Sequence, residues 1–166
     1  PFMISTIATN PPVQPLAMNA QLIAAARFHT GDMYTNRYQG HVGTAGDTVA
    51  TRIENAGYPF STAAEIVYSY AYSVIHGHAG FEVDWGDDPG SVGGMQNPPG
   101  HRINIHYAGF REIGVGVING DNPPVGPQLV TQNFGTRGGA GNVPMITGVA
   151  YYDLNGNSFY DIGEGI

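Results

Sequence analysis

The sequence predicts an α+β domain, because helical and strand-like patterns occupy different halves of the chain. Apolar residues recur at helical spacing in three segments between residues 19 and 74. Alternating apolar residues follow at 103–118 and again at 129–134, with glycines and turn residues between them. The chain has 166 residues, a length that suits one domain of ordinary size.

Three helices are expected from the apolar spacing. The first begins at Asn19, a residue type that caps helix N-termini well. The second is capped by Asp47 and ends at Gly57. The third is capped by Ser61 or Thr62 and ends near the histidines at 76 and 78. Its apolar stripe comprises Ala63, Ile66, Val67, Tyr70 and Val74.

Two strands are expected around the most informative stretch, residues 100–117. A glycine turn there presents His101 and Arg102, and residues 103–107 alternate like a strand. Residues 113–117 form a second alternating run, whose glycines leave room for another backbone or a helix to pack closely. A further strand is expected at Leu129–Phe134.

Composition excludes two classes of partner. Thirteen acidic residues against six basic ones give a formal net charge of -7. Nucleic acid and anionic membrane surfaces are therefore not expected partners, because both need a clustered basic face. No apolar run approaches the roughly 20 residues of a membrane span. The chain contains no cysteine, so disulfides give no information about its compartment, and Pro1 is expected to start a processed or trimmed chain.

Several ordered segments carry a family resemblance. The run Gly100-His101-Arg102-Ile103-Asn104-Ile105 and the run Glu112-Ile113-Gly114-Val115-Gly116 are similar to segments of bacterial CAP-superfamily domains, as is Arg52 to Tyr58. This superfamily comprises cysteine-rich secretory proteins, antigen 5 and pathogenesis-related 1 (SCP or PR-1-like domains). The resemblance covers roughly residues 12–135 and implies an α-β-α sandwich with a central, mostly antiparallel sheet. It also implies an extracellular or cell-surface protein.

The resemblance also suggests a division of the chain. Residues 1–135 are expected to form the CAP/SCP-like domain, lacking the family's N-terminal helix, with a rim loop at residues 86–100. Residues 136–145 read as a glycine-rich linker. Residues 146–166 are expected to begin a further module with a short β segment, since residues 147–152 alternate like a strand.

The resemblance, and not their spacing, places His41, Glu65 and His101 in one cleft, where the family has two histidines and two acids. The family's second acid has no clear counterpart in this sequence. His78 is the first candidate for its place, and Asp84 is the second. Two neutral imidazoles and a carboxylate can hold zinc or another divalent metal and leave a position open for water. The same set suits acid–base chemistry, and the alternative is a polar cluster that only orders the cleft.

A second pattern lies near the C-terminus, over residues 153–164. Oxygen-bearing side chains stand at loop positions 1, 3, 5, 9 and 12, and position 7 would ligate through its backbone carbonyl, which is the EF-hand order for calcium. These residues are Asp153, Asn155, Asn157, Phe159, Asp161 and Glu164. Position 6 is Ser158 instead of glycine, and flanking helices are not evident. We expect a structural calcium site with a dissociation constant on the order of 10⁻⁴ to 10⁻³ M, or else a polar turn without metal.

Three functions are compatible with these patterns. The first is an exported binding or interaction domain whose partner is a small apolar ligand or a protein. The second is a metal-dependent hydrolase that uses the cleft, although no Gly-x-Ser-x-Gly turn or cysteine nucleophile supports it. The third is a self-assembling subunit of an extracellular fibre or surface layer, which the low proportion of charged residues, 11%, would suit.

Overall fold

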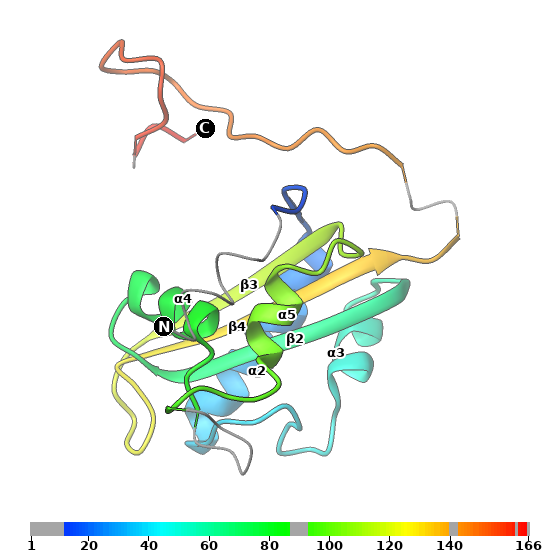
Figure 1. The fold of residues 1–166 in the computed structure, drawn as a ribbon, viewed down its shortest axis with the longest axis vertical. Coiled ribbons are helices and arrows are strands. Elements are labelled where there is room, and N and C mark those ends of the chain that lie inside the picture. Colours follow the sequence, from blue (N-terminus) through cyan, green and yellow to red (C-terminus); the bar gives the residue numbers. More distant parts are fainter. Residues whose placement is uncertain (1–11, 87–92, 140–142, 162, 166) are drawn as a thin grey trace.

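The sheet at the centre of the domain lies between helices on its two faces (Figure 1). The structure is a computed structural model and describes residues 12–86, 93–139, 143–161 and 163–165. Within these residues the strand order is β1-β3-β4-β2. β1 is parallel to β3, whereas the other two pairings are antiparallel, which confirms the predicted mostly antiparallel sheet. The strands are β1 (Ala17–Met18), β2 (Phe60–Ala71), β3 (Glu112–Asn119) and β4 (Gln128–Arg137).

The helices divide between the two faces of the sheet. α2 packs on β3 and β4, while α4 and α5 contact β2. Apolar clusters fill both interfaces: Phe81 of α4 packs with Ile66 of β2, and Met33 of α2 packs with Val67 of the same strand. The helices are α2 (Ala20–Asn36), α3 (Val49–Asn55), α4 (Val74–Val83) and α5 (Gly100–Ile105). Neighbouring residues of β2 thus face opposite layers.

Helix α2 lies directly on the backbone of β3. As predicted, Asn19 caps the helix, and its side chain accepts hydrogen bonds from the N–H groups of Gln21 and Leu22. A Cβ atom added at Gly114 would lie 2.0 Å from the carbonyl carbon of Leu22, and one at Gly116 would lie 2.6 Å from that of Ala26. The two glycines therefore allow the close helix–strand approach that the sequence predicts.

The third predicted helix is wrong, because residues 60–71 form strand β2. The helical spacing of its apolar residues is real, but the segment is rich in aromatic and β-branched residues, which favour strands. Pairing with β4 over most of its length, in the antiparallel sense, then decides the conformation. The helix starts later: Ser73 caps α4, which contains His76 and His78.

The strand predicted at residues 103–107 is also wrong, because residues 100–105 form helix α5. Tertiary contacts hold this short helix on the end of α4. The backbone N–H of Arg102 donates to Asp84, and the Arg102 side chain donates to the carbonyl oxygens of Glu82 and Val83. A smaller difference is that Thr48, not Asp47, caps α3.

The predicted C-terminal β segment is reduced, among the residues described there, to one bridge between Tyr151 and Gly165. β4 runs on to Arg137, two residues into the predicted linker. The N-terminal lead-in at residues 1–11, part of the rim loop (87–92) and part of the linker (140–142) lie outside the described residues. None of the helices described is long and apolar enough to span a membrane.

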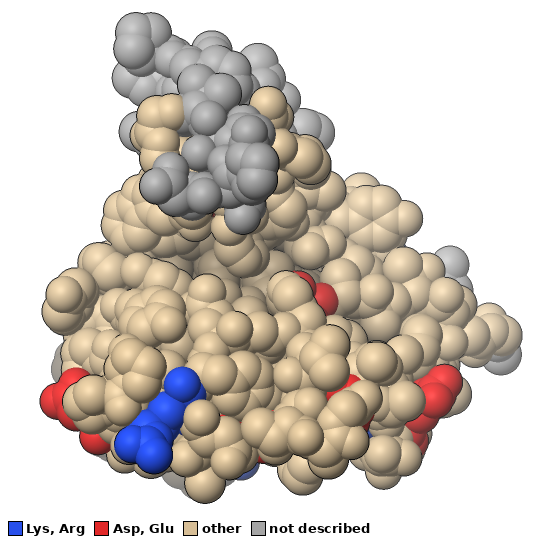
Figure 2. Space-filling view, turned by 90° about the horizontal axis from the view of Figure 1, so that it is seen from below, with Lys and Arg blue, Asp and Glu red and all other residues tan. Residues whose placement is uncertain are grey.

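Charged side chains are few and scattered on the face drawn in Figure 2.

A buried carboxylate, that of Glu112 at the start of β3, connects several segments of the interior by hydrogen bonds. It accepts hydrogen bonds from Asn19 Nδ2 at 2.8 Å, Tyr58 Oη at 2.7 Å and Arg137 Nε at 3.0 Å. Burial alone raises the pKa of Glu112, but these hydrogen bonds outweigh it and hold the pKa below its ordinary value.

Replacing Gly114 by alanine is expected to destabilise the domain by about 1–3 kcal/mol, because the new methyl group forces α2 away from β3. Urea unfolding measures the loss. Gly31→Ala is the matched control: it lies within α2 with open space around its Cβ position, so it should stabilise by about 0.5–1 kcal/mol. Equal effects of the two substitutions would contradict the proposed contact.

Glu112 predicts a specific loss of stability in acid. Its folded-state pKa is depressed, so its contribution is complete above the unfolded value of 4.5 and is lost as the pH falls below it. The stability difference between the wild type and Glu112→Gln should therefore be largest at neutral pH and shrink towards pH 3. Urea unfolding across this range tests it, with the exposed Glu54→Gln as control. A difference that is constant with pH would contradict the assignment.

Candidate functional site

Glu65 of β2 is the centre of the first polar group. Its side chain is fully buried, with 0% exposed, and faces the α2 side of the sheet. Both carboxylate oxygens accept from Arg52 Nη2, at 2.9 and 2.8 Å. Oε1 also lies 3.0 Å from His41 Nδ1, and the Asn133 amide, oriented to match its neighbours, donates to Oε2 at 3.0 Å. The structure therefore brings together the predicted pair His41 and Glu65.

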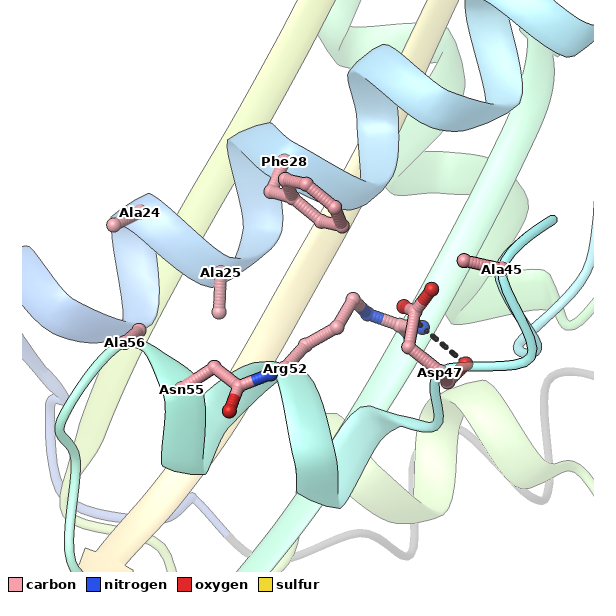
Figure 3. A pocket seen from close by; sticks show the side chains of 8 residues that line it. All are labelled: Ala24, Ala25, Phe28, Ala45, Asp47, Arg52, Asn55 and Ala56. Atoms are coloured by element: carbon pink, nitrogen blue, oxygen red, sulfur yellow. Dashed lines mark hydrogen bonds and ion pairs between the residues drawn. The ribbon is translucent and has the colours of Figure 1, made fainter.

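Arg52 of α3 balances this buried charge and connects three segments. Its Nη1 donates to the carbonyl oxygen and the carboxylate of Asp47, at 3.0 and 2.9 Å (Figure 3). Its Nη2 donates to the His41 carbonyl oxygen at 3.0 Å as well as to Glu65. Because burying a carboxylate is costly unless it is paired and hydrogen-bonded, the contact with Arg52 offsets the cost of burying Glu65 inside the domain.

His29 of α2 lies behind this group and is buried. Its Nε2 is 2.7 Å from the Gly40 carbonyl oxygen, which can only accept, so Nε2 carries the proton. Desolvation lowers the pKa of His29 and outweighs the opposing effect of nearby Glu65. The residue is thus a neutral part of the packing of α2.

The second polar group joins the ends of α4 and α5. His101 Nδ1 lies 2.7 Å from Asp84 Oδ1, and the Asp84 side chain is fully buried. Asp84 is the C-terminal cap of α4 and has a left-handed backbone, with φ of 63°, a conformation that aspartate tolerates better than most residues. Its second oxygen accepts the N–H of Arg102 at 3.1 Å. The His101 ring packs against Phe81.

The two groups lie near the edge strand β2. Glu65 is on its α2 side, whereas His101 approaches from the α4 side, where it lines a small hollow of about 50 Å³. That hollow also includes Gln39, two residues before His41, so the groups occupy neighbouring parts of one edge. Its other lining residues are Val67, Tyr68, Gly80, Phe81, Trp85 and Gln96.

His78 lies elsewhere. It is exposed on α4 and lines a separate hollow over β3 and β4, and no contact within the described residues joins it to Glu65 or His101. The acid beside His101 is instead Asp84, which the sequence analysis placed second. Asp84 holds this place because it is the C-terminal cap of α4, a position that depends on where the helix ends.

The pairing determines the tautomer of both histidines. A carboxylate can only accept a hydrogen bond, so in the neutral form of each ring Nδ1 carries the proton and Nε2 has an unshared electron pair. Neither Nε2 has a hydrogen-bond partner within the described residues. The side chains of His41 and His101 are 53% and 18% exposed, so solvent reaches both. Glu65 and Asp84 thus act as supports that orient imidazoles, which is the usual arrangement behind a metal-binding histidine.

The described residues contain no group of three or more histidine or acidic side chains arranged to hold a metal ion. The fit to zinc therefore rests on the two imidazoles and their supporting carboxylates. Glu65 itself does not fit as a direct ligand, because both of its oxygens are occupied by Arg52.

The C-terminal loop is closed by its own polar side chains. Asp153 accepts the backbone N–H groups of Asn157 and Ser158, at 3.1 and 2.9 Å. The amide nitrogens of Asn155 and Asn157 both donate to Asp161 Oδ2, which lowers the pKa of Asp161.

Glu164, at the twelfth loop position, is buried, and it closes the far end of the turn. It accepts from the N–H groups of Leu154 and Asp161, both at 3.0 Å. The acids at the first, ninth and twelfth loop positions are thus each held by hydrogen bonds within this turn, and within the described residues these three do not form a group that could hold a metal ion. A cation there would replace amide donors at Asp161 and would need Asn155 and Asn157 to turn their oxygens inward.

Comparisons with known proteins agree on the fold. Residues 9–134 match the model of CAP, the cysteine-rich secretory protein family. An extracellular protein containing an SCP domain from Bacillus anthracis str. Ames is 24% identical, with a TM-score of 0.57, over 74% of this chain and 34% of that one. An outer surface protein from Borrelia burgdorferi is 18% identical, with a TM-score of 0.60, over 82% of this chain and 90% of that one. A comparison with curated protein sequences gave no match.

Proposed function

We propose that this chain, which belongs to the cysteine-rich secretory protein family, is the binding domain of an exported protein and binds its ligand through His41 and His101. Both similar structures are of proteins described as extracellular or outer-surface, and this chain spans only about a third (34%) of the Bacillus protein. The proposal concerns the domain, and the activity of a longer protein would add to it.

One observation carries the proposal: two imidazoles, one exposed and one partly buried, each direct Nδ1 to a fully buried carboxylate. A surface histidine with no role needs no such support. Holding the ring in one tautomer leaves the opposite nitrogen ready to bind a divalent metal ion or an N–H or O–H donor.

Zinc is the metal that suits this donor set best, since neutral imidazole is one of its preferred ligands. When bound, it would supply a Lewis acid. His41 and His101 would hold it, while Glu65 and Asp84 would keep their rings oriented. The hydrolase alternative requires this metal, so hydrolysis is tested only if zinc binds.

A fibre or surface-layer subunit is the third candidate. Such a subunit would sediment as larger assemblies when the protein concentration is raised.

Zinc titration by calorimetry tests the cleft. If both imidazoles bind one ion, His41→Ala and His101→Ala should each weaken zinc at least as much as the loss of a supporting carboxylate does, about 10–100-fold. His78→Ala is the matched control, because that exposed histidine lies in a different hollow, and it should leave affinity unchanged. If His78→Ala weakens zinc equally, or neither of the other variants does, the cleft assignment fails.

We also propose that residues 153–164 form a structural calcium site. The supporting feature is the buried Glu164 carboxylate, which closes the turn at the position where an EF-hand loop uses a bidentate glutamate. Asp153 and Asp161 would supply further charge, Asn155 and Asn157 amide oxygens, and Phe159 a backbone carbonyl.

Calcium should bind the wild type with a dissociation constant on the order of 10⁻⁴ to 10⁻³ M and should shift the amide signals of this loop in NMR spectra. Glu164→Gln keeps the shape and removes one ligand charge, so binding should fall below detection. Glu54→Gln, an exposed change on α3, is the control. Loop signals that stay unmoved in millimolar calcium would identify the segment as a metal-free turn.

A further inference from the structure

Asparagine followed by glycine occurs twice in the sequence, at residues 119–120 and at residues 155–156. Asparagine is a chemically labile residue, because the backbone nitrogen of the next residue can attack its side-chain carbonyl carbon and close a five-membered ring. Glycine favours this attack, since it has no Cβ atom to hinder the approach. The two dipeptides are identical, so a difference in their reactivity would come from the structure around them.

The dipeptide Asn119-Gly120 is held in the sheet. Asn119 is the last residue of β3 and pairs with Gln128 of β4, whose side chain donates to Asn119 Oδ1 at 2.7 Å. The Gly120 N–H donates to the carbonyl oxygen of Pro127, also at 2.7 Å. The nitrogen that would attack is therefore already used, and turning it towards Asn119 Cγ would break hydrogen bonds at the end of the ladder.

The dipeptide Asn155-Gly156 lies in the turn of residues 153–164, which Figure 1 draws apart from the helices and the sheet. Both residues are exposed, and neither belongs to a helix or a strand. Within the described residues, the Gly156 N–H makes no hydrogen bond. The attacking nitrogen is therefore open to the hydroxide that must remove its proton.

The hydrogen bonds of the Asn155 side chain suit the reaction. Its Oδ1 accepts from the Asn157 N–H at 3.0 Å, so a donor faces the oxygen on which negative charge develops when the Gly156 nitrogen attacks Cγ. Its Nδ2, the group that leaves, donates to Asp161 Oδ2 at 2.6 Å. Because these bonds lie within one exposed turn, the rotation needed for ring closure costs less than it would at the end of β3.

We propose that Asn155 is a site of spontaneous deamidation. The Gly156 nitrogen loses its proton to hydroxide and forms a bond to Asn155 Cγ, and the bond from Cγ to Nδ2 breaks as the amide group takes up a proton and leaves as ammonia. Water then opens the resulting succinimide ring. Attack of water at Cγ gives aspartate, and attack at the backbone carbonyl carbon gives isoaspartate. In sum, one water molecule is consumed and one ammonia is released.

The product changes the charge of the turn. In aspartate, the new carboxylate replaces the amide that now donates to Asp161, so two carboxylates would face each other and repel. Position 155 is the third position of the calcium loop, where asparagine or aspartate is usual, and a further ligand charge strengthens calcium binding. This effect on calcium rests on the calcium site proposed above, whereas the reaction itself does not.

Trypsin separates the two dipeptides, because the chain has Arg111 and Arg137 as cleavage sites and contains no lysine. The intact protein is incubated at mildly alkaline pH without metal. Mass spectrometry of peptides 112–137 and 138–166 then measures the replacement of –NH₂ by –OH, and fragment ions assign its position. Asn155 should convert roughly tenfold or more faster than Asn119 in the folded protein. In urea that unfolds the domain, the two rates should become similar.

Asn155→Gln is the matched variant. It keeps an amide, but ring closure would need a less favourable six-membered ring, so conversion at this position should disappear. Equal rates for Asn155 and Asn119 in the folded protein, or a difference that persists in urea, would overturn the role of the turn. A rate at Asn155 that does not rise with pH would overturn attack by the Gly156 nitrogen.

Calcium titration of Asn155→Asp, which carries the aspartate product from the start, tests the effect on the loop. This variant should bind calcium several-fold more tightly than the wild type, because it adds one ligand charge. An unchanged affinity would overturn this effect. If neither protein binds calcium, the calcium site proposed above is wrong, and the measured deamidation of Asn155 is unaffected by that failure.

Discussion

The buried ion pair between Arg52 and Glu65 is the interaction on which the described site depends. Taking both charges out of water is costly, and their attraction compensates only when further hydrogen bonds use the remaining donors and acceptors. Here His41 and Asn133 supply further hydrogen bonds to the Glu65 carboxylate, while Asp47 accepts a further hydrogen bond from the Arg52 guanidinium. The pair thereby fixes the loop that carries His41 and connects α3 to β2. Arg52 Nε, in contrast, is buried without a hydrogen-bond partner among the described residues.

The strand order and the packing of α2 together decide what is accessible at the sheet. Because Gly114 and Gly116 let the helix lie on the strand backbone, α2 covers β3 and β4. Among the described strands β2 lies at one edge, with β4 as its neighbour and polar groups on both sides. An edge position gives the imidazoles of His41 and His101 access to solvent, while their supporting carboxylates remain inside the domain. Rigid supports and accessible nitrogens are both needed for selective binding.

Two kinds of carboxylate occur in this chain, and their surroundings give them different roles. Glu65, Asp84 and Glu112 are buried within the domain: Glu65 and Glu112 accept hydrogen bonds from several distant segments, and Asp84 accepts from the start of α5. The acids of residues 153–164 instead bond within one short segment. The first kind organises the tertiary fold. The second shapes a local turn, and for that reason its pattern is readable in sequence and has no bearing on the packing of the domain.

The sequence by itself determined the features that depend on neighbouring residues. These are the Asn19 cap, the strands β3 and β4, the tight glycine packing, and the family segments that carry His41, Glu65 and His101. Tertiary structure decided the rest. Residues 60–71 have apolar residues at helical spacing, and only pairing with β4 makes them a strand. Asp84 became the partner of His101 because two helix ends meet there, and Glu65 became a support because Arg52, which belongs to a different element, occupies its oxygens. Local periodicity carries no information about such long-range contacts, so they could not be predicted from the sequence.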